Sequence, residues 1–354
     1  MRKKLFDYVI GNPPYNEDFE NSGDNGNFAK PVYNYFMDAT YGIADKVELI
    51  HPARFLFNAG STPKAWNDKM LNDEHFKILS YEANSKNVFS NTDIKGGVAI
   101  SYRDAEKNYG AIGTFTAFEE LNSVLKKVTA ISKDFLNDII SGRGVYKLSN
   151  KALKEHPEII KIQSVGHKKD VGAGAFIKLS GIVFFSEKPD DGYDYVKYLG
   201  LISNKRNYSW GRKDYLDVPD SFYRYKIFIP KANGSGALGE VLSTPLIGEP
   251  LIGEPLIGAT ETFLSIGAFD TFEEADNCLK YVRGKFARVM LGILKITQDN
   301  TKDKWRYVPL QDFTPNSDID WSKSVHEIDL QLYRKYGLDD KEIDFIESHV
   351  KEMA

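Results

Sequence analysis

The segment Asn12-Pro13-Pro14-Tyr15 combines residue types that could activate an exocyclic amine of a nucleobase. Such a nitrogen is a poor nucleophile because its lone pair is delocalised into the ring. Two hydrogen-bond acceptors, the Asn12 side-chain oxygen and the Pro13 carbonyl, would draw it toward a tetrahedral geometry. The prolines fix the turn and remove competing N–H donors. Tyr15 offers a face on which an extruded base could stack.

The residues around this segment predict the elements that must position it. Residues 5–10 are short and β-prone and run into Gly11, which indicates a buried strand that delivers the tetrapeptide to its carboxyl end. Further strands are expected at 47–50, 78–83 and 97–102, and helices at 31–44 and 64–74. Strands that alternate with helices favour an open α/β sheet with its active loops at the strand ends.

Residues 6–15 resemble the catalytic motif of adenine-N6 DNA methyltransferases from bacterial restriction–modification systems, in the form typical of the gamma motif order. In that family the asparagine and the backbone of the following proline hold the adenine amino group, and the tyrosine stacks on the ring. The resemblance therefore assigns these roles to Asn12, Pro13 and Tyr15, with Pro14 completing the catalytic turn.

Two further segments are similar to the same family. Asn87-Val88-Phe89, followed by Asp93 to Ile100, matches a later loop and strand, where a phenylalanine packs on the second side of the extruded base. The resemblance assigns that role to Phe89, and the alternative is a core phenylalanine beneath a loop. Residues 51–56 are similar to a segment that lines the wall of the family's site.

The family uses S-adenosylmethionine, which it holds with a Gly-x-Gly turn after a strand that precedes the catalytic one. Only ten residues precede Gly11. The nearest substitute, Asp170-Val171-Gly172-Ala173-Gly174, follows a polar stretch and precedes a β-prone run, the reverse of the order that a cofactor loop needs. We therefore expect a truncated or split enzyme that binds no cofactor alone and depends on a separate polypeptide for the cofactor-binding half.

The pattern changes after the first region. Residues 1–115 are assigned to a partial, Rossmann-like methyltransferase domain, and residues 116–141 to a helical connector. Residues 142–354 are expected to form a mostly β (α+β) target-recognition domain with a helical C-terminus. Its predicted strands include 176–179, 182–185, 225–229 and 262–266. Its predicted helices are 272–296, which begins from Asp270 as N-cap, and 339–352.

The second region resembles the recognition region of large restriction–modification methyltransferases, which implies a double-stranded DNA partner. The segments that carry this resemblance are 228–236, 260–263, 285–288, 305–313 and 319–321. The chain has a net charge of −4, yet residues 195–235 hold eight Lys or Arg against three acids, and residues 279–306 hold eight against two. Local basic surface decides phosphate binding, although solvated helix faces would give the same counts. The predicted DNA contacts are Lys205, Arg206, Arg212, Lys213, Lys231, Arg283, Lys285 and Arg288.

Two other functions remain open. One is a DNA-binding specificity module of a restriction–modification system without catalysis. The other is a metal-dependent nuclease built from Asp190, Asp194 and Lys197, although their spacing is too tight for the two strands that such a site uses. The tandem Leu-Ile-Gly-Glu-Pro units at 246–250 and 251–255, with a partial third at 256–258, predict an extended loop. That loop is either an adjustable recognition element or a neutral duplication.

Composition excludes several classes of protein. The single cysteine, Cys278, rules out a disulfide framework and a cysteine metal cluster, and it fits a reducing cytoplasm. No stretch approaches the ~18 apolar residues of a membrane span, and the basic start is not followed by the apolar segment of a secretory signal. The 20 Tyr and 22 Phe fit either a β-domain core or a surface that stacks on bases.

Overall fold

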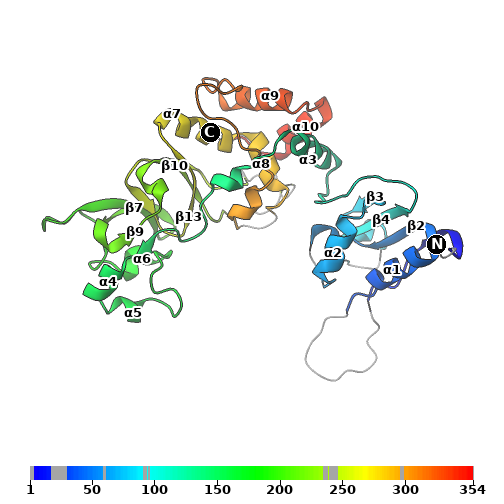
Figure 1. Ribbon diagram of the computed structural model, residues 1–354, viewed down its shortest axis with the longest axis horizontal. Coiled ribbons are helices and arrows are strands. Elements are labelled where there is room, and N and C mark those ends of the chain that lie inside the picture. The colour runs from blue at the N-terminus through cyan, green and yellow to red at the C-terminus, as the bar shows by residue number, and fades with distance from the viewer. Residues whose placement is uncertain are drawn as a thin grey trace. The chain divides into compact units, whose positions relative to one another are not determined.

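The computed structural model describes residues 4–16, 30–58, 61–90, 94, 96–233, 238, 246–295 and 299–353. The chain divides into two compact units, Met1–Glu119 and Glu120–Ala354, which are considered separately (Figure 1). Parts of four segments discussed above lie outside the described residues, namely 1–3, 91–93 with 95, 234–236, and 296 at the end of the helix predicted at 272–296.

The first unit alternates strands and helices along the chain, as its sequence predicts. Its strands are β1 (Phe6–Gly11), β2 (Ala44–Pro52), β3 (Phe76–Glu82) and β4 (Val98–Asp104). Its α-helices are α1 (Tyr33–Ile43) and α2 (Lys64–Leu71), and two 3-10 turns cover Arg54–Phe57 and Ser85–Asn87. All four predicted strands and both predicted helices are therefore present, with ends that differ by a few residues. The prediction that the first strand is buried is wrong, because β1 is a terminal strand with no buried residue.

The four strands form one mixed sheet in the order β1-β2-β4-β3. β1 runs parallel to β2, and β4 is antiparallel to both of its neighbours. One face of the sheet packs on α1 and α2 through the aromatic side chains of Tyr33, Phe55, Trp66 and Phe76, all of them buried. The Phe55 and Trp66 rings lie 5.0 Å apart in an edge-on arrangement, which is favourable for aromatic pairs.

The second unit has more helix than its sequence suggests. Its α-helices are α3 (Glu119–Ile131), α4 (Asn150–Glu155), α5 (Ile159–Ile162), α6 (Ala175–Lys178), α7 (Phe272–Arg283), α8 (Lys285–Gly292), α9 (Val325–Lys335) and α10 (Asp340–His349). Its strands are β5 (Lys147–Leu148), β6 (Phe184–Phe185), β7 (Tyr195–Ile202), β8 (Lys205–Arg212), β9 (Leu216–Asp217), β10 (Tyr225–Pro230), β11 (Leu251–Gly253), β12 (Ile257–Ala259) and β13 (Phe263–Phe269). Short 3-10 turns cover Leu136–Ile139, Lys213–Tyr215, Asp220–Tyr223 and Lys302–Trp305.

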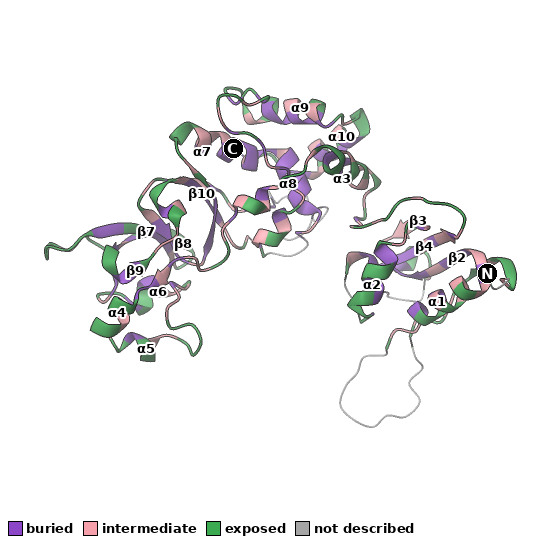
Figure 2. Ribbon diagram, in the orientation of Figure 1, coloured by how far each residue is buried: buried purple, intermediate pink, exposed green. Residues whose placement is uncertain are grey.

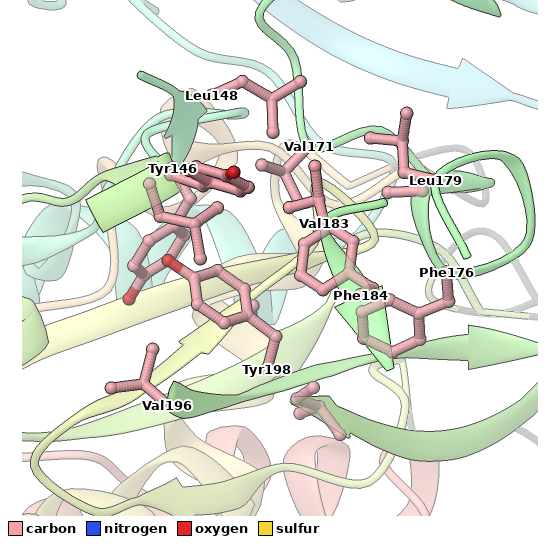
Figure 3. Close-up of a cluster of buried hydrophobic side chains, with 14 of the residues drawn as sticks. Tyr146, Leu148, Val171, Phe176, Leu179, Val183, Phe184, Val196 and Tyr198 are labelled. Atoms are coloured by element: carbon pink, nitrogen blue, oxygen red, sulfur yellow. The ribbon is translucent and has the colours of Figure 1, made fainter. Parts of the chain in front are cut away.

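Two sheets of this unit enclose its core. One has the order β12-β7-β8-β6 and the other the order β11-β10-β13. Figure 3 shows the buried cluster between them and the neighbouring loops, with Tyr146, Phe176, Phe184 and Tyr198 among its rings. The strand predicted at 176–179 is wrong, because these residues fall almost entirely within helix α6, whose Ala175 and Phe176 point into this core. A four-residue apolar run fits either element, so periodicity alone could not decide.

The Leu-Ile-Gly-Glu-Pro repeat is not the surface loop that its Gly and Pro residues suggest. Its second copy forms β11, which pairs with β10, and the partial third copy forms β12, which pairs with β7. A Cβ on Gly253 would lie 2.4 Å from the Phe228 ring, and one on Gly258 would lie 2.5 Å from the Tyr198 ring. The glycines are therefore required for close packing, and the copies belong to two different sheets of the core.

The C-terminal helices pack on one another through capped ends. Thr271, not Asp270, is the N-cap of α7, since its hydroxyl accepts the Glu274 N–H at 3.2 Å. Ser324 and Glu327 form a capping box at the start of α9, which the sequence analysis did not predict. Figure 2 shows α8 as buried along most of its length, which is consistent with its apolar side chains.

Candidate active site and nucleic-acid surface

The Asn12–Tyr15 turn follows the carboxyl end of β1, at the end of the first sheet where several chain segments meet. Gly11 at the end of β1 pairs with Leu49, so the turn follows directly beside the end of β2. Pro52 and Glu82 both pair with Val98, so the ends of β2 and β3 lie next to the start of β4. The segments that follow β1, β2 and β3 therefore gather at the carboxyl ends of these strands, as active loops of α/β sheets do.

Tyr15 and Phe89 lie together at this end of the sheet, although 73 residues lie between them in the sequence. Their ring centroids are 6.4 Å apart, with an angle of 68° between the ring planes. The Tyr15 carbonyl accepts the Val32 N–H at 3.0 Å, and Asn16 forms an isolated bridge with Pro31. These contacts fix the backbone at the Tyr15 end of the turn, and the pairing of Gly11 with Leu49 fixes the end that precedes Asn12.

The Tyr15 hydroxyl is buried and has no hydrogen-bond partner among the described residues. Burial raises the pKa of this phenol, which keeps it neutral. Asn12 and Pro14 are exposed, and Pro13 is half-buried. For the Asn12 side chain, the described part of the chain supplies no hydrogen-bond partner. The turn thus presents a free amide to solvent beside a half-buried aromatic ring.

His51, near the end of β2, packs inside the first unit. It is fully buried, stacks on the Tyr33 ring at 6.1 Å, and its burial lowers its pKa to about 4. Nδ1 lies 3.1 Å from the Pro52 carbonyl, which can only accept, so this nitrogen carries the proton. Nε2 then accepts the Ser101 hydroxyl at 2.8 Å. The neutral, fully engaged imidazole has a structural role, consistent with a wall of the site.

Arg54 is a residue at this edge that the sequence analysis left without a role. Its exposed side chain packs over Gly96, where a Cβ would approach the Arg54 Cγ to 2.4 Å. Gly96 and Gly97 have φ of +87° and +78°, and a Cβ on Gly97 would lie 2.4 Å from the Glu82 carbonyl. The paired glycines before β4 were the available signal, because a double glycine indicates close backbone approach.

The glycine turn at 170–174 is occupied by the protein's own side chains. The Ala173 N–H donates to the Glu261 carboxylate at 3.3 Å. Asp170 pairs with Lys147 at 2.6 Å and with His167 at 2.7 Å, and these hydrogen bonds lower its pKa. The turn belongs to the second unit and leads into the four-residue α6. Its acid and the Ala173 N–H are already used, and the turn leads into a helix of only four residues, so it is a poor fit for a cofactor.

Three of the predicted DNA contacts are exposed side chains of the second unit. Lys205 starts β8 directly after a turn in which Ser203 and Asn204 both have positive φ. Arg206 follows it and donates to the Glu249 carbonyl, while Lys213 begins a 3-10 turn after β8. Lys205 and Lys213 make no ion pair within the described residues, so both ammonium groups are available to phosphates.

Three other predicted contacts are engaged in ion pairs. Lys231 lies 3.7 Å from Glu261, and its side chain is 24% exposed. Lys285 pairs with Glu347 at 2.6 Å and is 15% exposed, and Arg283 pairs with Glu249. A phosphate would have to compete with these carboxylates, which makes the three side chains weaker candidates than the exposed lysines.

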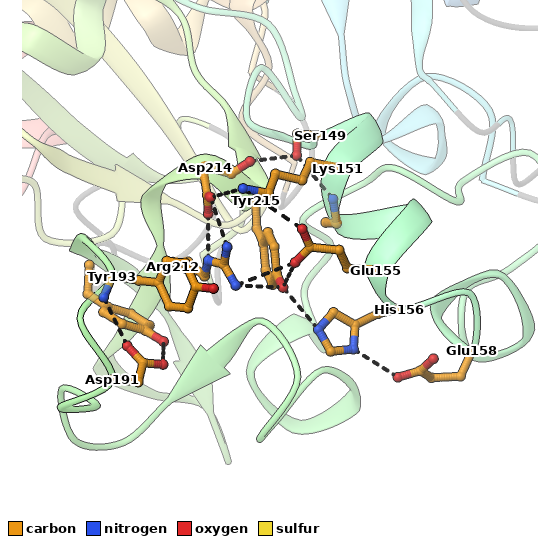
Figure 4. A network of polar contacts seen from close by, with 12 residues as sticks. Ser149, Lys151, Glu155, His156, Glu158, Asp191, Tyr193, Arg212, Asp214 and Tyr215 are labelled. Carbon is orange, nitrogen blue, oxygen red and sulfur yellow. Dashed lines mark hydrogen bonds and ion pairs between the residues drawn. The ribbon is translucent and has the colours of Figure 1, made fainter.

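Arg212 is unsuited to contact DNA because it is locked inside a polar cluster (Figure 4). Its guanidinium lies 3.4 Å from the Tyr193 ring centroid and 4.2 Å from that of Tyr215. It also donates to Asp214 at 3.0 Å and to the Tyr215 hydroxyl at 2.8 Å. The cluster joins the end of β8 to α4 through Glu155, which lies 3.5 Å from Arg212. Its role is to hold these elements together.

Arg288 is likewise removed from the DNA-binding set. It is completely buried in α8, and its Nε donates to the Arg283 carbonyl at 2.9 Å and to the Gly284 carbonyl at 3.2 Å. A terminal nitrogen donates to the Lys351 carbonyl and so attaches the C-terminal segment. Burial lowers the pKa of this guanidinium to about 10. Sequence could not reveal this, because the partners are carbonyl oxygens at the end of α7 and 63 residues downstream.

The nuclease alternative gains no metal site. No group of three His, Cys, Asp or Glu side chains that could hold a metal ion occurs in the described part of the chain. Lys197 instead lies on β7 with its ammonium 5.3 Å from the Trp210 ring centroid.

Among the described residues, no helix is long and apolar enough to cross a membrane.

Comparison with known proteins bears on the region that contains the turn. Residues 1–89 match the Eco57I restriction-modification methylase family. The chain is also 32% identical over 105 residues to an uncharacterized adenine-specific methylase of Mycoplasma pneumoniae. That stretch is 29% of this chain and 24% of the relative, so the chain spans about a quarter of the curated relative it matches. The N-terminal region is therefore similar to methylases of restriction–modification systems, which supports a methyltransferase role.

A solved structure, the type IIG restriction endonuclease BpuSI, aligns with 97% of this chain and 54% of its own. The sequence identity is 11% and the TM-score is 0.33.

Proposed function

We propose that this chain carries the catalytic turn of a site-specific DNA adenine-N6 methyltransferase of a restriction–modification system. The observation that carries the proposal is the exposed Asn12–Tyr15 turn at the carboxyl end of β1, with the Tyr15 ring facing Phe89 across the edge of the sheet. The similarity of residues 1–89 to restriction–modification methylases supports the same reaction.

The turn would act on the amino group of an adenine extruded from the duplex. The Asn12 side-chain oxygen and the Pro13 carbonyl would each accept one hydrogen of that amine. With both hydrogens held, the nitrogen lone pair is drawn out of conjugation and becomes available for attack on a methyl group. Because the Asn12 amide is unbonded to other described residues, it can turn to the base without first breaking a hydrogen bond within the protein.

Tyr15 and Phe89 would hold the ring of the adenine. A base stacked on both sides needs faces about 7 Å apart, since each contact takes about 3.5 Å. The two centroids are 6.4 Å apart and the planes are inclined at 68°, so the pair has to turn toward parallel when a base enters. The Tyr15 backbone is held by its bond to Val32, so the change is made by the side chains of the pair.

The methyl donor of this family is S-adenosylmethionine, which supplies an electrophilic methyl group when it is bound. The 170–174 turn is a poor candidate for its site, since the Ala173 N–H donates to Glu261 and Asp170 pairs with Lys147. No residue of this chain is assigned to the cofactor. We propose that a second polypeptide brings the cofactor-binding half.

The place where such a polypeptide would dock is the free edge of the first sheet. β1 is the terminal strand of the order β1-β2-β4-β3, and Phe6, Tyr8 and Ile10 on one of its faces are 54%, 45% and 72% exposed. An edge strand with a row of exposed apolar side chains is a template for pairing with another strand. A strand added there would lie next to the catalytic turn.

The second unit would position the DNA. Lys205, Arg206 and Lys213 are the proposed phosphate contacts, with Lys231, Arg283 and Lys285 as contacts that require an ion pair to open. Such contacts set orientation and affinity without reading sequence. Binding should therefore weaken steeply with added salt.

The test is made in cells that naturally carry the chain, so that any partner is present. The gene is replaced by an Asn12→Ala variant, and N6-methyladenine is mapped across the genome by single-molecule sequencing. We expect one methylated sequence motif to lose its modification by about 100-fold or more, the effect of removing one preorganised polar contact to a reacting group. Binding of the purified variant to duplex DNA should be unchanged.

Asn150→Ala is the matched control, because Asn150 is an exposed asparagine of the second unit outside the site. Its methylation pattern should equal that of the wild type. If the Asn12→Ala strain keeps every methylated motif, the catalytic assignment is wrong and a DNA-binding specificity module without catalysis becomes the better description.

A further inference from the structure

The sheet β12-β7-β8-β6 packs one face on the core of the second unit. Its other face is buried at Leu199 and Ala259 and is open around Lys197 and Tyr208. Pairing in register places Ile257 of β12, Lys197 of β7, Trp210 of β8 and Phe185 of β6 in one row across all four strands. Side chains of one row point to the same face of a sheet. The row spans about 14 Å, since neighbouring strands lie about 4.8 Å apart.

This face exposes aromatic rings that a sheet normally buries. Trp210 and Phe185 are half-buried, and Tyr208, two residues before Trp210 and therefore on the same face, is 47% exposed. The other three tryptophans of the chain are buried, since Trp66, Trp305 and Trp321 are 8%, 0% and 6% exposed. Trp210 is thus the one tryptophan positioned to meet a ligand.

Cations lie over these rings. The Lys197 ammonium is 5.3 Å from the Trp210 ring centroid, and that of Lys188 is 5.8 Å from it. Neither lysine forms an ion pair within the described residues. Asp191, three residues after Lys188, accepts the Tyr195 hydroxyl at 2.7 Å, and this bond lowers the pKa of the Asp191 carboxyl and keeps it charged. The face therefore combines flat apolar surface with two ammonium groups that form no ion pair among the described residues.

We propose that the Trp210 face, made of Phe185, Lys188, Lys197, Tyr208 and Trp210, binds single-stranded DNA. The rings offer stacking platforms for unpaired bases, and the two ammonium groups beside Trp210 can contact phosphates of the same strand. Duplex DNA fits less well, because its base faces are covered by their neighbours in the stack and only base edges are open in the grooves. The inference is independent of the methyl transfer proposed above and needs neither the cofactor nor a second polypeptide.

Intrinsic tryptophan fluorescence tests the proposal directly on the full chain. Oligothymidylate of twelve nucleotides is added to the protein, and emission is recorded with excitation selective for tryptophan. Bases that stack on Trp210 should quench the exposed component of the emission in a saturable manner. An abasic oligomer with the same phosphates, and polyglutamate of the same charge, should quench much less, because neither can stack.

Variants separate stacking from charge, with binding followed by anisotropy of a 5′-fluorescein oligothymidylate. Trp210→Ala should weaken binding about tenfold, the loss of one base–aromatic stack, and Trp210→Phe should restore most of it. Replacing Lys188 and Lys197 together by Gln should lower the slope of log K against log salt by about 1.4, or about 0.7 per phosphate contact. Circular dichroism verifies that each variant keeps the wild-type melting temperature.

Three results would overturn the proposal. They are an equal loss of single-stranded and duplex binding in the Trp210→Ala variant, no loss of oligothymidylate binding in that variant, and polyglutamate competing as well as oligothymidylate. Tighter binding to oligouridylate than to oligothymidylate would assign the face to RNA and also contradict it. None of these outcomes affects the Asn12→Ala methylation test, so the two proposals fail separately.

Discussion

Two four-stranded sheets in this molecule each pack one face and leave at least part of the other open, but they leave different chemistry exposed. The sheet of the first unit covers one face with α1 and α2, and exposes Phe6, Tyr8 and Ile10 on its terminal strand β1. The sheet of the second unit covers one face with the core shown in Figure 3, and exposes rings accompanied by Lys188 and Lys197.

The difference indicates which kind of partner each surface suits. A row of apolar side chains on an unpaired edge gains most from another protein strand, because burial and backbone pairing act together. Rings beneath ammonium groups gain most from a ligand with flat bases and negative charge. We therefore propose that the exposed β1 strand is a docking site for protein and that the Trp210 face is a binding site for nucleic acid.

The largest expected effect comes from opening the closed core of the second unit. Asp329 of α9 is buried, and its carboxylate accepts the N–H groups of Lys285 at 2.8 Å and Phe286 at 3.1 Å at the start of α8. Asp329→Ala leaves both donors buried and unpaired, which should cost about 2–4 kcal/mol. Urea unfolding should show the loss, and the exposed Asp344→Ala of α10 is the control. A loss of unfolding free energy below about 1 kcal/mol, the net contribution of roughly one hydrogen bond, would show that water replaces the carboxylate. The core would then be less closed than described.

Asp329 also gives the second unit a dependence on pH. Burial raises its pKa to about 6, above the ordinary value near 3.8. The folded state therefore binds more protons than the unfolded state between these values, so its contribution to stability is complete below pH 4 and is lost as the pH rises through 6. Asp329→Asn should remove this dependence. If urea midpoints of the wild type and the Asn variant run parallel from pH 4 to 7, the carboxyl group is not the cause.

A smaller loss of stability is expected from a substitution in the Leu-Ile-Gly-Glu-Pro repeat, whose second and third copies form strands of the core. Gly253→Ala places a Cβ 2.4 Å from the Phe228 ring, and Phe228 is fully buried and cannot swing away. The overpacking should cost about 1–3 kcal/mol in thermal or urea unfolding. Gly142→Ala is the matched control, since nothing lies within 4 Å of its added Cβ. Equal stability of the two variants would restore the permissive loop that the sequence alone suggests.

These residues also show how far the sequence could predict the molecule. β1 and its turn were predictable because a β-prone run, a glycine and two prolines act locally. The approach of Phe89 to Tyr15 depends on the pairing of β3 with β4, which residue pattern alone does not specify. The burial of Arg288 depends on carbonyl oxygens far along the chain, and the strands inside the repeat depend on rings such as Phe228 that leave room only for glycine. Contacts of high sequence separation account for most of what was missed.

The exposed edge of the first unit predicts a variant that harms function without harming stability. Ile10 is 72% exposed, so Ile10→Ser should change unfolding by no more than about 0.5 kcal/mol. If β1 is completed by another polypeptide, the lost burial of one isoleucine should weaken that association about tenfold or more. Reduced methylation in cells at unchanged melting temperature is the expected outcome. Ile131→Ser, a similarly exposed isoleucine of α3, should leave methylation intact, and an equal drop in both strains would refute the docking edge.

The smallest effect concerns the charges that distinguish the second unit. Lys205 and Lys213 are exposed and unpaired within the described residues, so each can neutralise one phosphate of a duplex. Replacing either by Gln should lower the slope of log K against log salt by about 0.9, whatever the DNA sequence, because phosphate contacts are non-specific. Lys126 of α3 is equally exposed, and Lys126→Gln should leave the slope unchanged if charge acts locally. If all three variants shift the slope alike, only the total charge matters, and the contrast between the two open surfaces rests on the rings alone.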